Sequence, residues 1–285
     1  MKIVNSPVEM KNLSITLQRS GKTIGFVPTM GALHQGHLSL LNIAAKSTDA
    51  TVMSIFVNPS QFGPGEDYDK YPRTFELDSK KAQDAGCDIL FAPTAQDMYP
   101  PNYSSYVDVA KLDTKLCGAT RPDHFRGVCT VVLKFFNIVN PQIAVFGQKD
   151  AQQLIVLRRM VSDFNLSVSV ESGPVIREKD GLAMSSRNKY LTPHERRDAP
   201  LIYKGLKGAK ELFDSGERDG DKLIEMIKTH YKSSAMFTPE YIEVVDIVTL
   251  EPLKEIKDKA LIAVACKTSE SKTRLIDNIV LGGEL

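Results

Sequence analysis

Short apolar runs rich in β-branched residues alternate with longer amphipathic stretches over the first 175 residues of the chain. Such runs are typical of strands that are buried on both faces of a parallel sheet. They lie at residues 23–29, 50–58, 87–93, 142–147 and 166–172. Because strand and helix patterns alternate, the order predicts a Rossmann-like, doubly wound α/β domain.

Four stretches between these runs have the apolar spacing of helices, at residues 37–46, 74–85, 126–139 and 151–164. In the last of them, Leu154, Leu157, Val161 and Phe164 recur at intervals that place them on one face of a helix. One apolar face per helix is what covering a sheet requires.

The pattern changes after Gly173 and Pro174. Residues 193–216 and 220–234 are expected to form two amphipathic helices, and residues 238–250 and 260–281 are expected to form consecutive strands without helices between them. We therefore expect two domains, an α/β domain over residues 1–175 and a smaller α+β domain over residues 176–285.

Composition narrows the class of protein. The 285 residues are 42% hydrophobic, which excludes disorder as the main state. Thirty-six Lys and Arg oppose 35 Asp and Glu, so the net charge of +1 argues against a nucleic-acid partner. No stretch reaches the roughly 18 apolar residues of a membrane span, and the N-terminus lacks the apolar core of a signal peptide. We expect a soluble cytoplasmic protein without a membrane partner.

The four cysteines form no CxxC pair and have no histidine at zinc-finger spacing. In a chain able to build a large core they are expected to be reduced, buried thiols. No metal site made of protein ligands is predicted.

The segment PTMGALHQGHLSLL directly follows the first predicted strand and begins a helix. In it His34 and His37 are three residues apart, and Gly36 would let the backbone approach a ligand. Free N–H groups at a helix start, together with two imidazoles, suit the charge of a phosphate under attack. Surface or metal-binding histidines are the alternative interpretation, but the position at a strand end favours a nucleotide site.

The segment FGQKDAQQL brings Lys149 and Asp150 to the end of another predicted strand, where open α/β sheets bind ligands. Lys149 can contact phosphates. A solvated lysine in a turn and a helix-capping role for Asp150 remain open at this point.

The segment MSSRN, residues 184–188, offers two hydroxyls and the guanidinium of Arg187 as donors for a triphosphate. An ordinary polar turn is the alternative. Its place just after the expected domain boundary favours a phosphate contact that couples domain closure to catalysis.

The HxGH and MSSRN segments together resemble the HxGH nucleotidylyltransferase superfamily, which shares these motifs with class I aminoacyl-tRNA synthetases. Three longer segments, at residues 56–74, 121–154 and 177–191, resemble the pantoate–β-alanine ligase (pantothenate synthetase) family, and residues 274–278, RLIDN, show a weaker likeness. With the HxGH segment these make four long segments that agree in order and spacing, which is a highly specific match.

The resemblance implies a site made by three sets of residues. The catalytic set is His34, His37, Lys149 and Arg187. The residues implied for ATP are Met30, Gly31, Ala32, Leu33, His34, Gln35, Gly36, His37, Gly147, Gln148, Lys149, Asp150, Ile176, Met184, Ser185, Ser186 and Arg187. Those implied for pantoate and β-alanine are Asn58, Gln61, Tyr71 and Gln153, with residues 63–74 as a lid.

The activity that the resemblance implies is the ATP-dependent joining of (R)-pantoate to β-alanine through a pantoyl adenylate, which gives pantothenate, AMP and pyrophosphate. ATP is a substrate, Mg²⁺ is held mainly by its phosphates, and a homodimer is expected. Two alternatives stay open: a nucleotidyltransferase that leaves AMP on its product, and a noncatalytic module that senses adenine nucleotides.

Overall fold

The computed structural model describes all of residues 1–285, and the chain forms two compact units. Unit 1 comprises Met1–Thr114, Gly118–Gly147 and Val156–Gly173, and unit 2 comprises Lys115–Cys117, Gln148–Ile155 and Pro174–Leu285. The chain therefore passes between the units several times, so Lys149 belongs to unit 2 although a strand of unit 1 immediately precedes its turn.

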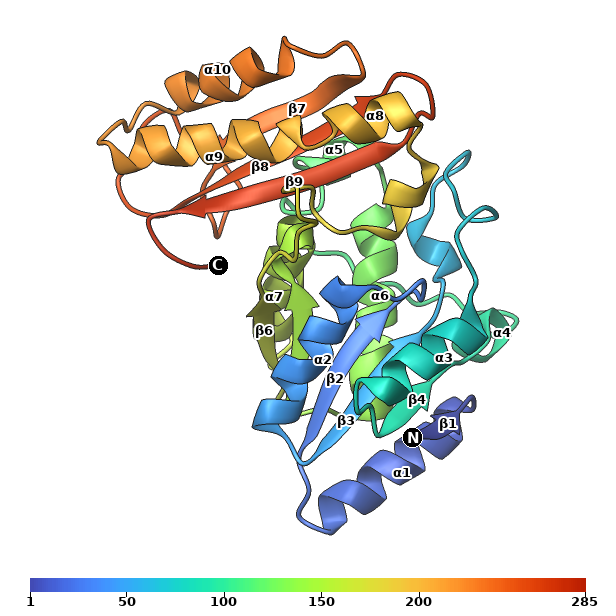
Figure 1. Cartoon of the computed structure of the whole chain (residues 1–285). Coiled ribbons are helices and arrows are strands. Elements are labelled where there is room, and N and C mark those ends of the chain that lie inside the picture. The colour runs from blue at the N-terminus through green and yellow to red at the C-terminus, as the bar shows by residue number, and fades with distance from the viewer. The chain divides into compact units, whose positions relative to one another are not determined.

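Unit 1 contains a six-stranded sheet in which every pairing is parallel. From β2 the chain adds β3 and β4 on one side and β5 and β6 on the other, so the winding direction reverses between the adjacent strands β2 and β5. Figure 1 shows β3 and β4 on one side of β2 and β6 on the other. Such a reversal is where doubly wound sheets bind ligands. In spatial order the strands are β1 (Lys2–Val4), β4 (Ile89–Phe91), β3 (Ala50–Ile55), β2 (Ile24–Thr29), β5 (Ile143–Gly147) and β6 (Ser169–Gly173).

Helices cover both faces of this sheet. Neighbouring residues of a strand point to opposite faces, and Val27 belongs to the same core cluster as Leu41 and Ala44 of α2, whereas the ring of Phe26 meets that of Phe135 in α6 at 5.6 Å between centroids. Thus α2 and α6 lie on opposite faces. The helices are α1 (Pro7–Arg19), α2 (Gln35–Ser47), α3 (Phe75–Asp84), α4 (Ala95–Met98), α5 (Cys117–Thr120), α6 (His124–Val139) and α7 (Ala151–Asp163), of which α5 and α7 pass from one unit to the other.

Unit 2 is built on a three-stranded antiparallel sheet in the order β7 (Phe237–Val245), β8 (Ala260–Thr268) and β9 (Arg274–Leu281). The amphipathic helices α9 (Leu201–Asp214) and α10 (Gly220–Tyr231) bury Leu206, Leu223 and Ile227 in one core with Ile262 and Val264 of the central strand. The short helix α8 (Pro193–Asp198) and the 3-10 turn η3 (Ser186–Tyr190) precede them.

The expected α/β fold with a smaller α+β part is confirmed, with three corrections. The single helix expected over residues 193–216 is interrupted, because Pro200 has no N–H to continue the bond ladder between α8 and α9. Residues 246–250, expected to continue a strand, lie outside β7, whereas the strand structure expected over residues 260–281 is confirmed as the hairpin of β8 and β9. The elements β1 and α1, at residues 2–19, were not anticipated.

None of the helices combines the length and apolar character that crossing a bilayer requires. All four cysteines are buried and free of disulfides, as expected. Burial raises the pKa of Cys87 to about 11 and that of Cys129 to about 12, so both thiols stay protonated at neutral pH.

Candidate active site

The two motif histidines form a reciprocal cap at the start of α2. Nδ1 of His34 accepts a 3.1 Å hydrogen bond from the backbone N–H of Gly36, and Nδ1 of His37 accepts one of 3.3 Å from the N–H of His34. The two rings are 4.1 Å apart between centroids and tilted by 34°. A ring nitrogen that accepts an N–H carries a lone pair, so these bonds assign both rings as neutral, with the proton on Nε2.

Gly36 is required by the ring of His34. A Cβ at this position would lie 2.8 Å from Cε1 and 2.9 Å from Nδ1 of that imidazole, which is closer than carbon atoms pack. The motif glycine therefore makes room for the first histidine, a reason for its presence beyond the backbone approach to a ligand expected from the sequence.

A buried carboxylate that belongs to none of the sequence motifs holds the loop before His34. Asp78 of α3 accepts backbone N–H bonds from Ala32 at 2.8 Å and Leu33 at 2.7 Å, and its side chain is fully buried. Ala32 has a φ of 51°, in the left-handed region that L-residues rarely adopt, so the carboxylate stabilises a strained turn. Lys81 adds a 2.6 Å bond to the carbonyl oxygen of Leu33.

One signal in the sequence could have identified Asp78. It is four residues before Ala82, and both residues occupy the buried face of α3. A carboxylate at a core-facing position of an amphipathic helix needs donors to offset its burial, and backbone N–H groups of a neighbouring loop are suitable ones.

Two of the residues expected to bind pantoate, Asn58 and Gln61, meet Met30 of the HxGH loop within unit 1. Asn58, 1% exposed, donates from Nδ2 to the side-chain oxygen of Gln61 at 3.0 Å and to the carbonyl oxygen of Gly127 at 3.1 Å. Gln61, at the end of the turn η1 (Pro59–Gln61), points its amide nitrogen to the sulfur of Met30 at 3.1 Å. These contacts bring Asn58, Gln61 and Met30 together.

The segment 63–74 is fastened to the start of α6 by an ion pair. Arg121 donates from Nε and Nη2 to the two carboxylate oxygens of Glu66, at 2.6 and 2.5 Å. Burial would raise the pKa of Glu66, but the hydrogen bonds and charge of Arg121 outweigh burial and lower it. Arg121 also donates to the backbone oxygen of Gln61, at 3.3 Å, so one guanidinium joins the expected lid to the residue expected to hold pantoate.

His124 completes this contact. Nε2 of His124 lies 3.1 Å from Nη1 of Arg121, which can only donate, so Nδ1 carries the ring proton and donates to the Gln61 oxygen at 2.8 Å. Tyr71, the lid residue expected near the substrates, is 5% exposed and packs against Phe62, at 6.1 Å between ring centroids.

Unit 2 carries the remaining expected residues. Lys149 and Asp150 lie in the 3-10 turn η2 (Gln148–Asp150), with 3.9 Å between Nζ and the carboxylate, and Gln153 follows in the first turn of α7. The backbone N–H of Met184 donates to the carbonyl oxygen of Ile176 at 2.9 Å, which joins two residues expected in the ATP site.

The MSSRN segment forms a defined turn. Ser185 caps η3 by accepting a 3.2 Å bond from the N–H of Arg187, and Ser186 is buried. Asn188 donates to the carbonyl oxygen of Ala183 at 3.1 Å and to Glu178 at 3.0 Å. The side chains of Ser185 and Asn188 therefore hold the turn that carries Arg187.

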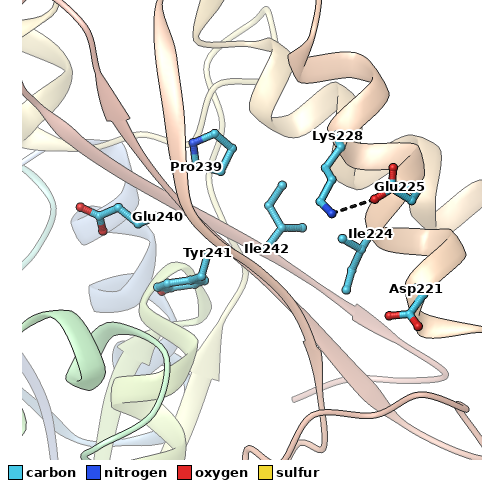
Figure 2. A pocket seen from close by; sticks show the side chains of 8 residues that line it. All are labelled: Asp221, Ile224, Glu225, Lys228, Pro239, Glu240, Tyr241 and Ile242. Atoms are coloured by element: carbon cyan, nitrogen blue, oxygen red, sulfur yellow. Dashed lines mark hydrogen bonds and ion pairs between the residues drawn. The ribbon is translucent and has the colours of Figure 1, made fainter.

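A surface pocket elsewhere in unit 2 contains none of the expected residues. It lies between α10 and β7 and is lined by Asp221, Ile224, Glu225, Lys228, Pro239, Glu240, Tyr241 and Ile242 (Figure 2). Lys228 pairs with Glu225 at 2.7 Å. No group of three or more His, Cys, Asp or Glu side chains in the chain is arranged to hold a metal ion.

Comparison with known proteins identifies the family. The family model for pantoate-beta-alanine ligase matches residues 2–280. The chain belongs to the pantoate–β-alanine ligase family. It is 52% identical to the pantothenate synthetase of Thermotoga neapolitana over 282 residues, 99% of this chain and 100% of that one.

Solved structures of the family agree with the fold. The pantothenate synthetase of Thermus thermophilus superimposes with a TM-score of 0.92 at 42% identity, covering 98% of this chain and 99% of that one. The pantoate-beta-alanine ligase of Francisella tularensis, complexed with beta-gamma ATP and beta-alanine, matches with a TM-score of 0.79 at 31% identity over 98% and 97% of the chains. The resemblance drawn from the four sequence segments is confirmed, and the chain is an enzyme of the ligase family.

Proposed function

We propose that the chain condenses (R)-pantoate with β-alanine, with ATP as the energy source, and releases pantothenate, AMP and pyrophosphate. Membership of the pantoate–β-alanine ligase family supports the overall reaction. The observation that carries the mechanism is the histidine cap of α2, because it places two neutral imidazoles, each with its proton on Nε2, at a helix N-terminus, where N–H donors suit a phosphate.

In the first step a pantoate carboxylate oxygen attacks the α-phosphorus of ATP, and the bond from that phosphorus to the bridging oxygen of pyrophosphate breaks. Negative charge grows on the α-phosphate oxygens and on the leaving pyrophosphate. His34 and His37 donate to the α-phosphate oxygens, and the charges of Lys149 and Arg187 stabilise the departing pyrophosphate. Because these donors are already in place, they stabilise the charge of the transition state without reorganisation, and this accelerates adenylation.

In the second step the amine of β-alanine attacks the acyl carbon of pantoyl adenylate. The carbon–oxygen bond to AMP breaks, and the amine loses a proton as the amide forms. Dividing the reaction in this way replaces a poor acyl donor, the carboxylate, with a mixed anhydride. Asn58, Gln61, Gln153 and Tyr71 hold the two acid substrates with uncharged donors and acceptors, which do not attack the anhydride.

The remaining expected residues complete the nucleotide site. Residues 30–37 and 147–150 contact ATP, together with Ile176 and residues 184–187. A Mg²⁺ ion would be held mainly by the phosphate oxygens of ATP, where it would neutralise part of their charge. The half-exposed carboxylate of Asp150, beside Lys149, offers a hard oxygen donor of the kind that Mg²⁺ accepts.

We further propose that residues 1–175 form the catalytic domain and residues 176–285 the domain that carries MSSRN, that the enzyme is a homodimer, and that it works in the cytoplasm, where ATP is supplied. Light scattering of the purified protein tests the dimer.

Product analysis tests the reaction. The purified chain is incubated with ATP, pantoate and β-alanine, and products are resolved by chromatography and mass spectrometry. We expect equal amounts of AMP, pyrophosphate and a new amide. A stable adenylylated pantoate with no amide would support the nucleotidyltransferase alternative, and unchanged ATP would support the sensor.

A further inference from the structure

Two adjacent polar side chains are buried in β9, the last strand of unit 2. Asp277 is 4% exposed and Asn278 is 2% exposed. Burying such groups costs free energy unless their hydrogen bonds are made. Asp277 receives two bonds from Arg177, at 2.6 and 3.0 Å, so its position is accounted for by an ion pair.

Asn278 has a different partner, the turn that carries Lys149. Its amide nitrogen donates to the carbonyl oxygens of Gln148 and Lys149, both at 2.9 Å. Its amide oxygen accepts a 3.3 Å bond from the side chain of Gln148. One buried amide therefore holds the carbonyl groups of two consecutive residues, which fixes the peptide plane between them.

The turn needs this support because it has little of its own. The 3-10 turn η2 spans three residues, Gln148–Asp150, and such short 3-10 pieces have poor internal hydrogen-bond geometry. Lys149 leaves the backbone at the centre of this turn, and its side chain is 21% exposed. The peptide that Asn278 holds fixes the Cα from which the lysine side chain extends.

The geometry points to Asn278 as a positioning residue for Lys149. It contacts the backbone on either side of the lysine Cα, and it acts on the departing pyrophosphate through that lysine. This inference rests on the proposed function, which places Lys149 on the departing pyrophosphate. Asn278 is the last residue of the RLIDN segment, so this segment, although far from the other motifs in sequence, would contribute to adenylation.

A double-mutant cycle tests the inference. Asn278→Asp keeps the size of the side chain but replaces the donor of both bonds with an oxygen. We expect it to slow pantoate-dependent ATP–pyrophosphate exchange by at least about tenfold, the effect of losing two buried hydrogen bonds. In the Lys149→Ala background, Asn278→Asp should slow this exchange by less than about threefold, since there is no lysine left to position.

Val280→Ala is the matched control. Val280 is buried two residues further along β9 and has no bond to the turn, so this change weakens the strand but should leave exchange per folded molecule within about twofold of wild type. If Val280→Ala slowed exchange as much as Asn278→Asp does, Asn278 would have only a structural role. The same conclusion would follow if the double variant Asn278→Asp/Lys149→Ala lost exchange activity by the product of the two single-variant losses.

A second readout is independent of activity. Amide hydrogen exchange over residues 147–153 should become faster in Asn278→Asp than in Val280→Ala, because the turn loses its anchor. Unchanged protection there would also overturn the inference. If the wild-type enzyme shows no pantoate-dependent exchange, the proposed function fails, whereas the hydrogen-exchange result still decides whether Asn278 holds the turn.

Discussion

The buried carboxylate of Asp78 accepts a 2.7 Å hydrogen bond from the backbone N–H of Leu33, the residue immediately before the first motif histidine. Its other oxygen accepts from Ala32. A side chain from α3 therefore fixes the loop that leads from β2 into the histidine cap, and the geometry of the cap depends on a residue 45 positions away in sequence.

Asp78→Asn should impair adenylation with little change in overall fold. An asparagine can accept only one of the two backbone N–H bonds, and its NH₂ group faces the other N–H. Leaving that donor unpaired costs about 1–3 kcal/mol, or roughly 5- to 150-fold in rate if the cost falls on the active loop.

ATP–pyrophosphate exchange per folded molecule, with circular dichroism as the check of folding, measures this effect. Asp84→Asn, on the exposed side of the same helix, is the control and should match wild type. If Asp78→Asn exchanged at the wild-type rate, the carboxylate would not control the histidine loop.

Gly36→Ala separates helix stability from ring position. Alanine favours a helix by up to about 1 kcal/mol over glycine, so on propensity alone α2 should gain stability. The new Cβ would, however, lie 2.8 Å from the ring of His34 and displace it. We expect exchange to fall by about 10² or more, the scale of losing one preorganised donor, with the melting temperature unchanged or lowered only slightly.

Asn42→Ala, on the exposed face of α2, is its control and should keep full activity. If Gly36→Ala kept full exchange activity, adenylation would not require the observed position of the His34 ring.

Gln61→Ala and Gln153→Ala should weaken pantoate binding specifically. Each amide can donate to and accept from the hydroxyl and carboxylate groups of pantoate, and neither carries a charge suited to a triphosphate. Calorimetry should show the Kd for pantoate rising at least about tenfold, and that for ATP by less than about threefold. If both variants raised the Kd for pantoate and the Kd for ATP equally, the assignment of these residues to pantoate would be wrong.

Glu195 gives unit 2 a pH-dependent contribution to stability. It is 1% exposed, and its carboxylate accepts backbone N–H bonds from Glu270 and Ser271, both at 2.8 Å, and from Thr192 at 3.0 Å. Burial would raise its pKa, but a side-chain hydrogen bond from Ser271 and these backbone bonds outweigh burial and lower the pKa from 4.5 to about 2.

Because the folded-state pKa is below the unfolded value, this stabilisation is fully present above pH 4.5 and is lost as the pH falls toward 2. Glu195→Gln should lower the melting temperature at pH 7 by roughly 3–10 °C, and the gap from wild type should close on acidification. Glu211→Gln, exposed on α9, serves as the control. A gap that stays constant from pH 7 to pH 3 would show that the carboxylate charge is not what stabilises the contact.

Elements with a strong local signal could be predicted from the sequence. The buried runs that became β2, β3 and β5 were recognisable because an apolar, β-branched run is what a doubly covered strand requires. The strand β1 was not, because it has three residues and is defined by pairing with β4, more than 80 positions later. The proline at position 200 is a local signal for the break between α8 and α9, but the apolar periodicity on either side of it favoured one continuous helix.

In the candidate site, too, some features have a local sequence signal and others depend on contacts between distant residues. Spacing and position after a strand pointed to His34 and His37, but their tautomers follow from backbone contacts that only the folded loop provides. Asp78 and Asn278 act over 45 and about 130 residues of sequence, respectively, and no local pattern links such pairs. Motifs located the residues that could perform chemistry, whereas the residues that orient them required the structure.

The two-step mechanism is tested most directly by isotope exchange between labelled pyrophosphate and ATP in the presence of pantoate and the absence of β-alanine. Formation of pantoyl adenylate is reversible and does not involve the amine, so we expect label to enter ATP only when pantoate is present. Exchange that requires β-alanine as well would contradict a separate adenylation step and indicate a concerted reaction.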